Sequence, residues 1–198
     1  MPKLYERLPD SITVKGRRYP LDLGFRNVLK MMDIMARDDL LPASRDWYAL
    51  RCVLVKRPPR RFEPVLSAVL LLLFGKDKKP AGERVTSFEQ DADLIRAAFW
   101  QEYGVNLYRD NLHWFEFIAL LRNLPGGCKY TDVLNIRVQE IPAATKYNAK
   151  EREAILKAKA AYALELTKEE RQERYERAVH GAFVSMSRMA KDGEENGR

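Results

Sequence analysis

The sequence contains few of the residues that most often carry catalysis, metal binding or covalent cross-links. Its 198 residues include two cysteines and two histidines. Cys52 and Cys128 lie far apart and in no spacing typical of a metal site, so we expect two buried thiols and no disulfide scaffold. His113 and His180 have no cysteine or second histidine at a ligand spacing, which favours structural or surface roles. We expect no metal and no cofactor.

Catalytic sequence motifs are also absent. The run Gly75-Lys76-Asp77 lacks the upstream glycine and the following hydroxyl residue of a phosphate-binding loop, and no GxSxG, HExxH or EF-hand pattern occurs. Asp91 and Asp93 lie two residues apart, so on a helix they point to different sides and suit the positive end of the helix dipole better than acid/base chemistry. We expect no enzymatic activity.

Long apolar runs are missing as well. The longest, Val65–Phe74, has about half of the roughly 20 residues that a helix needs to cross a bilayer. Its residues are apolar on nearly every side, which predicts a helix at the centre of the core that ends at Gly75. The first residues contain no apolar stretch of signal-peptide length. We therefore expect a protein of the cytoplasm with no membrane partner.

What the sequence does contain is an ordinary globular mixture, with 46% hydrophobic and 32% charged residues. This composition excludes collagen-like and wholly disordered chains. The length suits one domain. We expect a mainly α-helical fold: a helical core with a small N-terminal β-hairpin over residues 1–145, and a charged, extended helical segment with a disordered end over residues 146–198.

Local patterns place the individual elements. Alternating apolar residues on both sides of Lys15-Gly16 predict a hairpin, with Pro20 on an edge strand. Apolar spacing of three and four predicts helices over about residues 25–37, from Trp47 toward Pro58, from a cap at Ser87 to Gly104, from a cap at Asn111 to Pro125 and over 131–138. Ser87 and Gln90 have the spacing of a capping box, and Asn111 is the predicted cap of the next helix.

Two C-terminal helices are predicted over residues 149–165 and 168–190, with caps at Asn148 and Thr167. The second carries an apolar stripe of Tyr175, Val179, Phe183, Met186 and Met189. This stripe either docks on the core of the chain or binds a partner. Trp114 and Phe115 are further candidates for a partner interface, because adjacent helical residues cannot face the same way; the alternative is burial against different neighbours.

The net charge of +7 is unevenly distributed. Residues 1–80 hold 17 basic and 9 acidic side chains, whereas residues 81–145 hold 6 and 9. The excess centres on two loops between predicted helices: one holds Lys56, Arg57, Arg60 and Arg61, and the other is Lys76-Asp77-Lys78-Lys79. Such a patch attracts phosphates or an acidic protein face. A solvated basic loop is the simpler interpretation, because no motif that places side chains at nucleic acid bases is present.

Three runs occur in a specific order. They are GRRYPL at 16–21 with Phe25-Arg26, FEQDADLIRAAF at 88–99 with YGVNL at 103–107, and LHWFEFIALL at 112–121 with Leu124-Pro125 and Ile136-Arg137. Together they resemble the bacteriophage gene-product-fifteen family over roughly residues 8–142. Residues 146–198 hold no matching motif.

The resemblance implies a protein of a long-tailed phage or prophage that acts in the host bacterial cytoplasm. It also implies a non-catalytic tail assembly chaperone, which covers the apolar stripes of the helical tape-measure protein, with self-association of the chain compatible with that role. No catalytic residues are implied. Two alternatives stay open: a structural subunit of the virion, such as a tail terminator or connector, and a nucleic-acid-binding protein that uses the basic patch.

Overall fold

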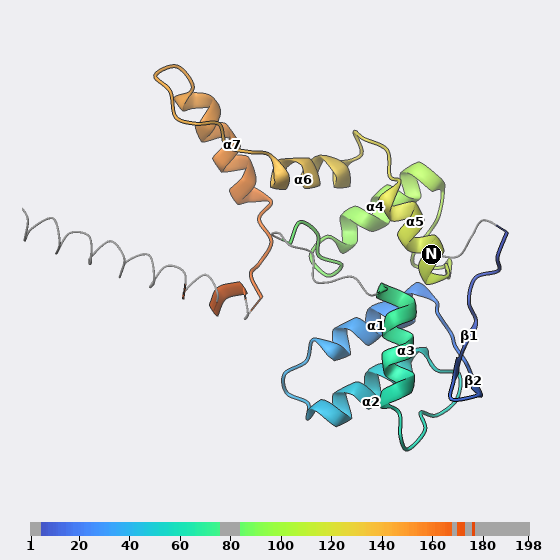
Figure 1. The fold of residues 1–198 in the computed structure, drawn as a ribbon. Helices are drawn as coiled ribbons and strands as arrows, with labels where there is room; N and C mark the ends of the chain where they lie inside the picture. The colour runs from blue at the N-terminus through green and yellow to red at the C-terminus, as the bar shows by residue number, and fades with distance from the viewer. Residues whose placement is uncertain (1–4, 76–83, 168–169, 173–175, 177–198) are drawn as a thin grey trace, which may run out of the picture.

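A computed structural model describes residues 5–75, 84–167, 170–172 and 176 (Figure 1). Its elements, in chain order, are β1 (Ser11–Val14), β2 (Arg17–Pro20), α1 (Phe25–Met35), α2 (Pro42–Val53), α3 (Glu63–Phe74), α4 (Ala92–Tyr103), α5 (Trp114–Arg122), α6 (Lys129–Val138) and α7 (Ala149–Ala161). The predicted mainly helical fold with a small hairpin is confirmed. The predicted helix over 168–190 and the disordered end lie almost wholly outside the described residues.

The hairpin is an antiparallel pair in which Ser11 lies opposite Pro20 and Val14 opposite Arg17. Lys15 and Gly16 both have positive φ, of 49° and 76°, as a tight two-residue turn requires. Beyond β2, Leu21 forms an isolated antiparallel bridge with Leu54. This bridge ends α2 at Val53, several residues before the prolines that were expected to stop it, because Leu54 takes an extended conformation.

The core is built around a group of stacked and edge-on aromatic rings. Phe117 of α5 is 1% exposed, and its ring lies 4.8 Å from that of Phe25 and 5.3 Å from that of Phe99. Trp114 and Phe88 pack on Phe117 at 5.9 and 6.1 Å. These contacts join α1, α4 and α5, and the burial of large aromatic surfaces stabilises that arrangement.

Helix α3 does not lie at the centre of the core as expected. Val65, Leu66, Val69 and Leu73 are buried, but Leu71 is 49% exposed and Phe74 is 40% exposed. Hydrophobicity on every side predicts burial only where enough other elements surround a helix, and one side of α3 has too few neighbours. Its predicted end at Gly75, with φ 74°, is confirmed.

Two predicted helix caps are wrong in detail. Helix α4 begins at Ala92, and the Ser87 hydroxyl accepts a hydrogen bond from the Gln90 N–H in the turn before it. Helix α5 begins with His113 as its N-cap, and Asn111 lies before it. The predicted left-handed end of α4 at Gly104 is confirmed, with φ 66°.

The C-terminal part continues from α6 into α7. Helix α6 begins at Lys129, two residues before the predicted start, and α7 ends at Ala161, four residues before the predicted end. Thr167 and Glu170 form the predicted reciprocal cap: each backbone N–H is bound by the other side chain, at 2.8 and 3.1 Å. Figure 1 shows α7 at the end of the molecule opposite the hairpin.

Candidate interaction surfaces

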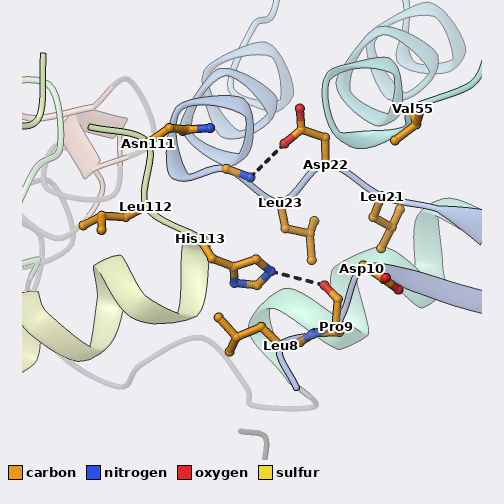
Figure 2. A pocket seen from close by; sticks show the side chains of 11 residues that line it. Leu8, Pro9, Asp10, Leu21, Asp22, Leu23, Val55, Asn111, Leu112 and His113 are labelled. Atoms are coloured by element: carbon orange, nitrogen blue, oxygen red, sulfur yellow. Dashed lines mark hydrogen bonds between the residues drawn. The ribbon is translucent and has the colours of Figure 1, made fainter. Parts of the chain in front are cut away.

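A cavity of about 420 Å³ lies where three extended stretches of chain meet (Figure 2). They are the segment before β1, the link between β2 and α1, and the segment before α5. The cavity is lined by Leu8, Pro9, Asp10, Leu21, Asp22, Leu23, Gly24, Val55, Asn111, Leu112 and His113. Backbone hydrogen bonds join the second and third stretches, from the Trp114 N–H to the Leu23 oxygen and from the Phe25 N–H to the Leu112 oxygen.

His113 holds one side of this cavity together. Its Nδ1 accepts a hydrogen bond from the Phe115 N–H at 3.3 Å, which assigns the ring proton to Nε2, and Nε2 then donates to the Pro9 oxygen at 3.2 Å. The Glu116 carboxylate accepts from the His113 N–H and completes a capping box. Because both ring nitrogens are engaged, His113 is a structural histidine, as the sequence predicted.

Two carboxylates that line the cavity also have partners. An Asp22 carboxylate oxygen accepts from the Gly24 N–H at 3.2 Å, and Asp10 pairs with Arg18. The Ser11 hydroxyl and Arg18 stabilise the carboxylate of Asp10 and hold its pKa below the ordinary value. Leu8, Leu21, Leu23 and Leu112 belong to the apolar part of the lining.

A buried ion pair joins α4 to α6. The Asp91 carboxylate is 1% exposed and accepts from Arg137 at 2.7 and 2.8 Å and from the Ser87 N–H at 2.9 Å. Burial raises the pKa of Asp91, but the Arg137 guanidinium and the Ser87 N–H outweigh it and hold the pKa below the ordinary value. Sequence reasoning treated Asp91 as a helix-dipole charge and missed this role, since nothing near it in the sequence points to Arg137.

Arg137 extends the same network to the C-terminal segment. Its guanidinium also donates to the Val85 oxygen at 2.9 Å and to the Tyr162 oxygen at 2.7 Å. The Thr86 hydroxyl and the Tyr130 hydroxyl lie 2.9 Å apart beside it, and burial raises the pKa of Tyr130. One side chain therefore fastens the end of α7 to α4 and to the chain before it.

Helix α7 is held by polar contacts and buries none of its residues. The Lys159 ammonium donates to the Arg137 and Gln139 oxygens, at 2.6 and 2.7 Å, and so caps the C-terminal end of α6. Arg152 donates to the Pro142 oxygen. Because Arg152 and Lys159 both reach the chain after α6, that stretch runs alongside α7.

Exposed apolar side chains accompany this polar attachment. Val138 is 56% exposed, Ile141 39% and Leu156 48%. Val138 is the last residue of α6 and Ile141 follows it, while Leu156 lies on α7 between Arg152 and Lys159, the two residues that donate to carbonyl oxygens there. We call these three residues the α7 face. A helix that buries nothing and displays apolar side chains differs from the usual amphipathic surface helix, whose apolar stripe is turned inward.

The structure separates the predicted interface residues. Trp114 is 4% exposed and packs edge-on to Phe74 and stacked on Phe117, so it belongs to the core and presents no binding surface. Phe115 is half-buried beside His113. Trp114 and Phe115 therefore pack against different neighbours, as the alternative interpretation stated. Tyr175, Phe183, Met186 and Met189 lie outside the described residues.

The predicted basic patch is a surface loop. Lys56, Arg57, Arg60 and Arg61 are all exposed, while the second predicted basic loop, over 76–79, lies outside the described residues. The Arg57 guanidinium lies 5.8 Å from the centre of the Trp47 ring, in a cation–π contact. Of the predicted thiols, Cys128 is buried and Cys52 is half-buried; both are free, and burial raises the pKa of Cys52.

The model of the family described as Bacteriophage Gp15 protein matches residues 4–164, most of the chain. The chain belongs to this family. The match contains all three runs on which the resemblance rests and extends beyond them through α6 and α7, so the α7 face lies within the family region. Membership in the Gp15 family supports a structural or morphogenetic role in a bacteriophage.

Other comparisons add no relative. No curated protein and no solved structure matches the chain. Among the described helices, none combines the length and the apolar character that crossing a bilayer requires.

Proposed function

We propose that this Gp15 family protein is a non-catalytic tail assembly factor that binds the tape-measure protein in the host cytoplasm while the tail forms. The family match supports a bacteriophage role, and the α7 face is the observation that supports binding of a helical partner. A long helix with apolar stripes aggregates unless its stripes are covered, and exposed apolar side chains on a chaperone provide that cover.

The way α7 is attached suits such a partner. Isolated helices as short as the 13 residues of α7 are marginal in water, and α7 has little apolar packing of its own to stabilise it. A second helix laid along Val138, Ile141 and Leu156 buries apolar surface on both molecules. Lys159, on the same side of α7 as Leu156, donates to carbonyl oxygens at the end of α6 and holds the position of α7 meanwhile.

Co-expression tests the proposal. The chain is produced with overlapping fragments of the tape-measure protein from the same phage, and complexes are isolated by affinity purification at low salt. We expect at least one fragment to co-purify, and the double variant Val138→Ser, Leu156→Ser to lose most of it. The matched control, Leu41→Ser with Tyr108→Ser, removes two side chains that are 76% and 70% exposed elsewhere and should retain the complex.

Two results would contradict the proposal. If no fragment co-purifies with the wild-type chain, binding of the tape-measure protein is wrong. If the chain remains in mature particles in stoichiometric amounts, the alternative of a structural virion subunit replaces the chaperone, because an assembly chaperone leaves when the tail tube forms.

A further inference from the structure

We infer that the loop between α2 and α3 is a second binding surface, which takes an acidic segment of a protein partner with an apolar side chain next to its carboxylates. We call the side chains Lys56, Arg57, Arg60 and Arg61 the basic loop. This surface is separate from the α7 face, and the inference does not depend on the tape-measure protein.

The basic loop is held in a fixed shape. At its start, the Val55 N–H donates to the Pro20 oxygen at 3.2 Å, and Leu54 forms its bridge with Leu21. In its middle Pro58 is buried, and at its end Phe62 is 9% exposed and caps α3. Because both ends and the middle of the loop are anchored in the fold, its backbone loses little conformational entropy when a partner binds. A smaller entropy loss favours a higher affinity for that partner.

Among the described residues, the four cations of the basic loop have no acidic partner. Six other arginines are ion-paired, in Arg18–Asp10, Arg37–Asp39, Arg45–Asp46, Arg84–Glu170, Arg96–Asp93 and Arg137–Asp91. Single arginines such as Arg109 and Arg122 have no ion pair there either, but the basic loop differs from them in placing four such cations close together in the chain. In the part of the chain that the structure describes, no carboxylate pairs with a side chain of the basic loop. A concentration of unpaired like charge attracts an anionic partner and favours rapid association with it.

The surroundings favour a protein segment over nucleic acid. Surfaces that bind single-stranded nucleic acids usually offer open aromatic faces on which the bases stack. Trp47 instead has the Arg57 guanidinium over its ring and Tyr48 edge-on at 5.2 Å. Val55, which precedes Lys56 in the chain, and Tyr48, which packs on Trp47, are 58% and 51% exposed, and a sugar-phosphate backbone would leave that apolar area uncovered. Arg, Trp and Tyr side by side are also typical of the centres of protein interfaces.

Three synthetic probes test the inference on the full chain. The first is a helical peptide with glutamates on one face and leucines beside them, the second is polyglutamate of the same charge, and the third is a double-stranded DNA oligonucleotide. Binding is measured by fluorescence anisotropy of labelled probes over a salt series. We expect the glutamate-leucine peptide to bind most tightly, with an affinity that falls as salt rises.

A loop variant and a matched control separate the site from net charge. The loop variant carries Lys56→Gln, Arg57→Gln, Arg60→Gln and Arg61→Gln; the control carries Arg109→Gln, Arg122→Gln, Lys146→Gln and Lys150→Gln, which are exposed cations elsewhere. We expect the loop variant to weaken peptide binding roughly tenfold or more, because charge-assisted hydrogen bonds are lost, and the control to weaken it much less. Val55→Ser should weaken binding of the glutamate-leucine peptide and leave that of polyglutamate unchanged.

Three results would overturn the inference. If the control variant weakens binding as much as the loop variant, net charge alone attracts the probe. If DNA binds more tightly than the peptide and its binding depends on the basic loop, the surface is a nucleic acid site. If no probe binds the wild-type chain at low salt, the loop is not a binding surface for any of them. A thermal melt shows whether the loop variant is folded, and we expect it to be at least as stable as the wild type, because like charges have been removed.

Discussion

Replacing Arg137 with methionine tests whether the Asp91–Arg137 pair holds the two halves of the helical region together. The substitution keeps most of the volume and leaves a carboxylate that is 1% exposed without its cation. Removing one partner of a buried ion pair costs about 3–5 kcal/mol of unfolding free energy, because the remaining charge stays out of water. The donations from Arg137 to Val85 and Tyr162 are lost too.

A double-mutant cycle isolates the pair. The variants are Arg137→Met, Asp91→Leu and the combination, and unfolding in urea gives their free energies. The combination removes both charges, so we expect it to be less destabilised than the sum of the single variants, with a coupling of about 2 kcal/mol or more. The same cycle on Asp93 and Arg96 is the control: the Asp93 side chain is 94% exposed, and such pairs couple by about 0.5 kcal/mol.

The free energy of unfolding should change with pH in opposite directions in the wild type and in the Arg137→Met variant. In the wild type the pKa of Asp91 is lowered, so the contribution of the pair is complete above the ordinary carboxyl pKa near 4 and is lost as the pH falls through the folded value. In Arg137→Met the Asp91 carboxylate keeps only its burial and its hydrogen bonds to uncharged groups, so we expect the pKa of Asp91 to lie above the ordinary value. That variant should therefore regain stability as the pH falls from 7 toward 4. A coupling no larger than that of Asp93–Arg96, or equal pH profiles, would refute the reasoning.

Three further predictions concern single residues. His113→Ala should lower the unfolding free energy by about 1–2 kcal/mol in urea, whereas His113→Asp should retain most of it because aspartate also caps a helix; equal losses would contradict the capping role. Gly104→Ala should cost about 1 kcal/mol because its φ is 66°, while Gly126→Ala should be nearly neutral by the same assay, since its added Cβ meets nothing within 4 Å. Lys159→Met should speed hydrogen exchange in α7 with little effect on α4; uniform exchange would show that Lys159 does not fasten α7.

Features set by a few neighbouring residues could be predicted from the sequence. The turn at Lys15-Gly16 and the end of α4 at Gly104 both depend on single residues that adopt positive φ. Thr167 and Glu170 are three residues apart in the sequence, and they form the predicted reciprocal cap. Each depends on backbone geometry within one turn, so a local pattern is enough to identify it.

The candidate binding surfaces could not be predicted from neighbouring residues, because they depend on contacts between distant parts of the chain. Trp114 and Trp100 look equally available in the sequence, yet Trp114 is 4% exposed and Trp100 is 58% exposed, because only Trp114 faces the other core aromatics. The basic loop was visible as charge, but its anchoring at Leu54 and its apolar neighbours come from contacts with distant residues. Charge can be counted along a chain, whereas exposure requires every neighbour to be placed.

Asp91 and Asp93 mark the boundary between the two kinds of information. That both lie at the start of a helix can be read from neighbouring residues, since capping and periodicity act within a few residues. That Asp91 is enclosed and bound to Arg137, 46 residues later, while Asp93 stays in water, follows from the folded arrangement alone. Burial and ion pairing depend on which helices pack together, and packing is a property of the whole chain.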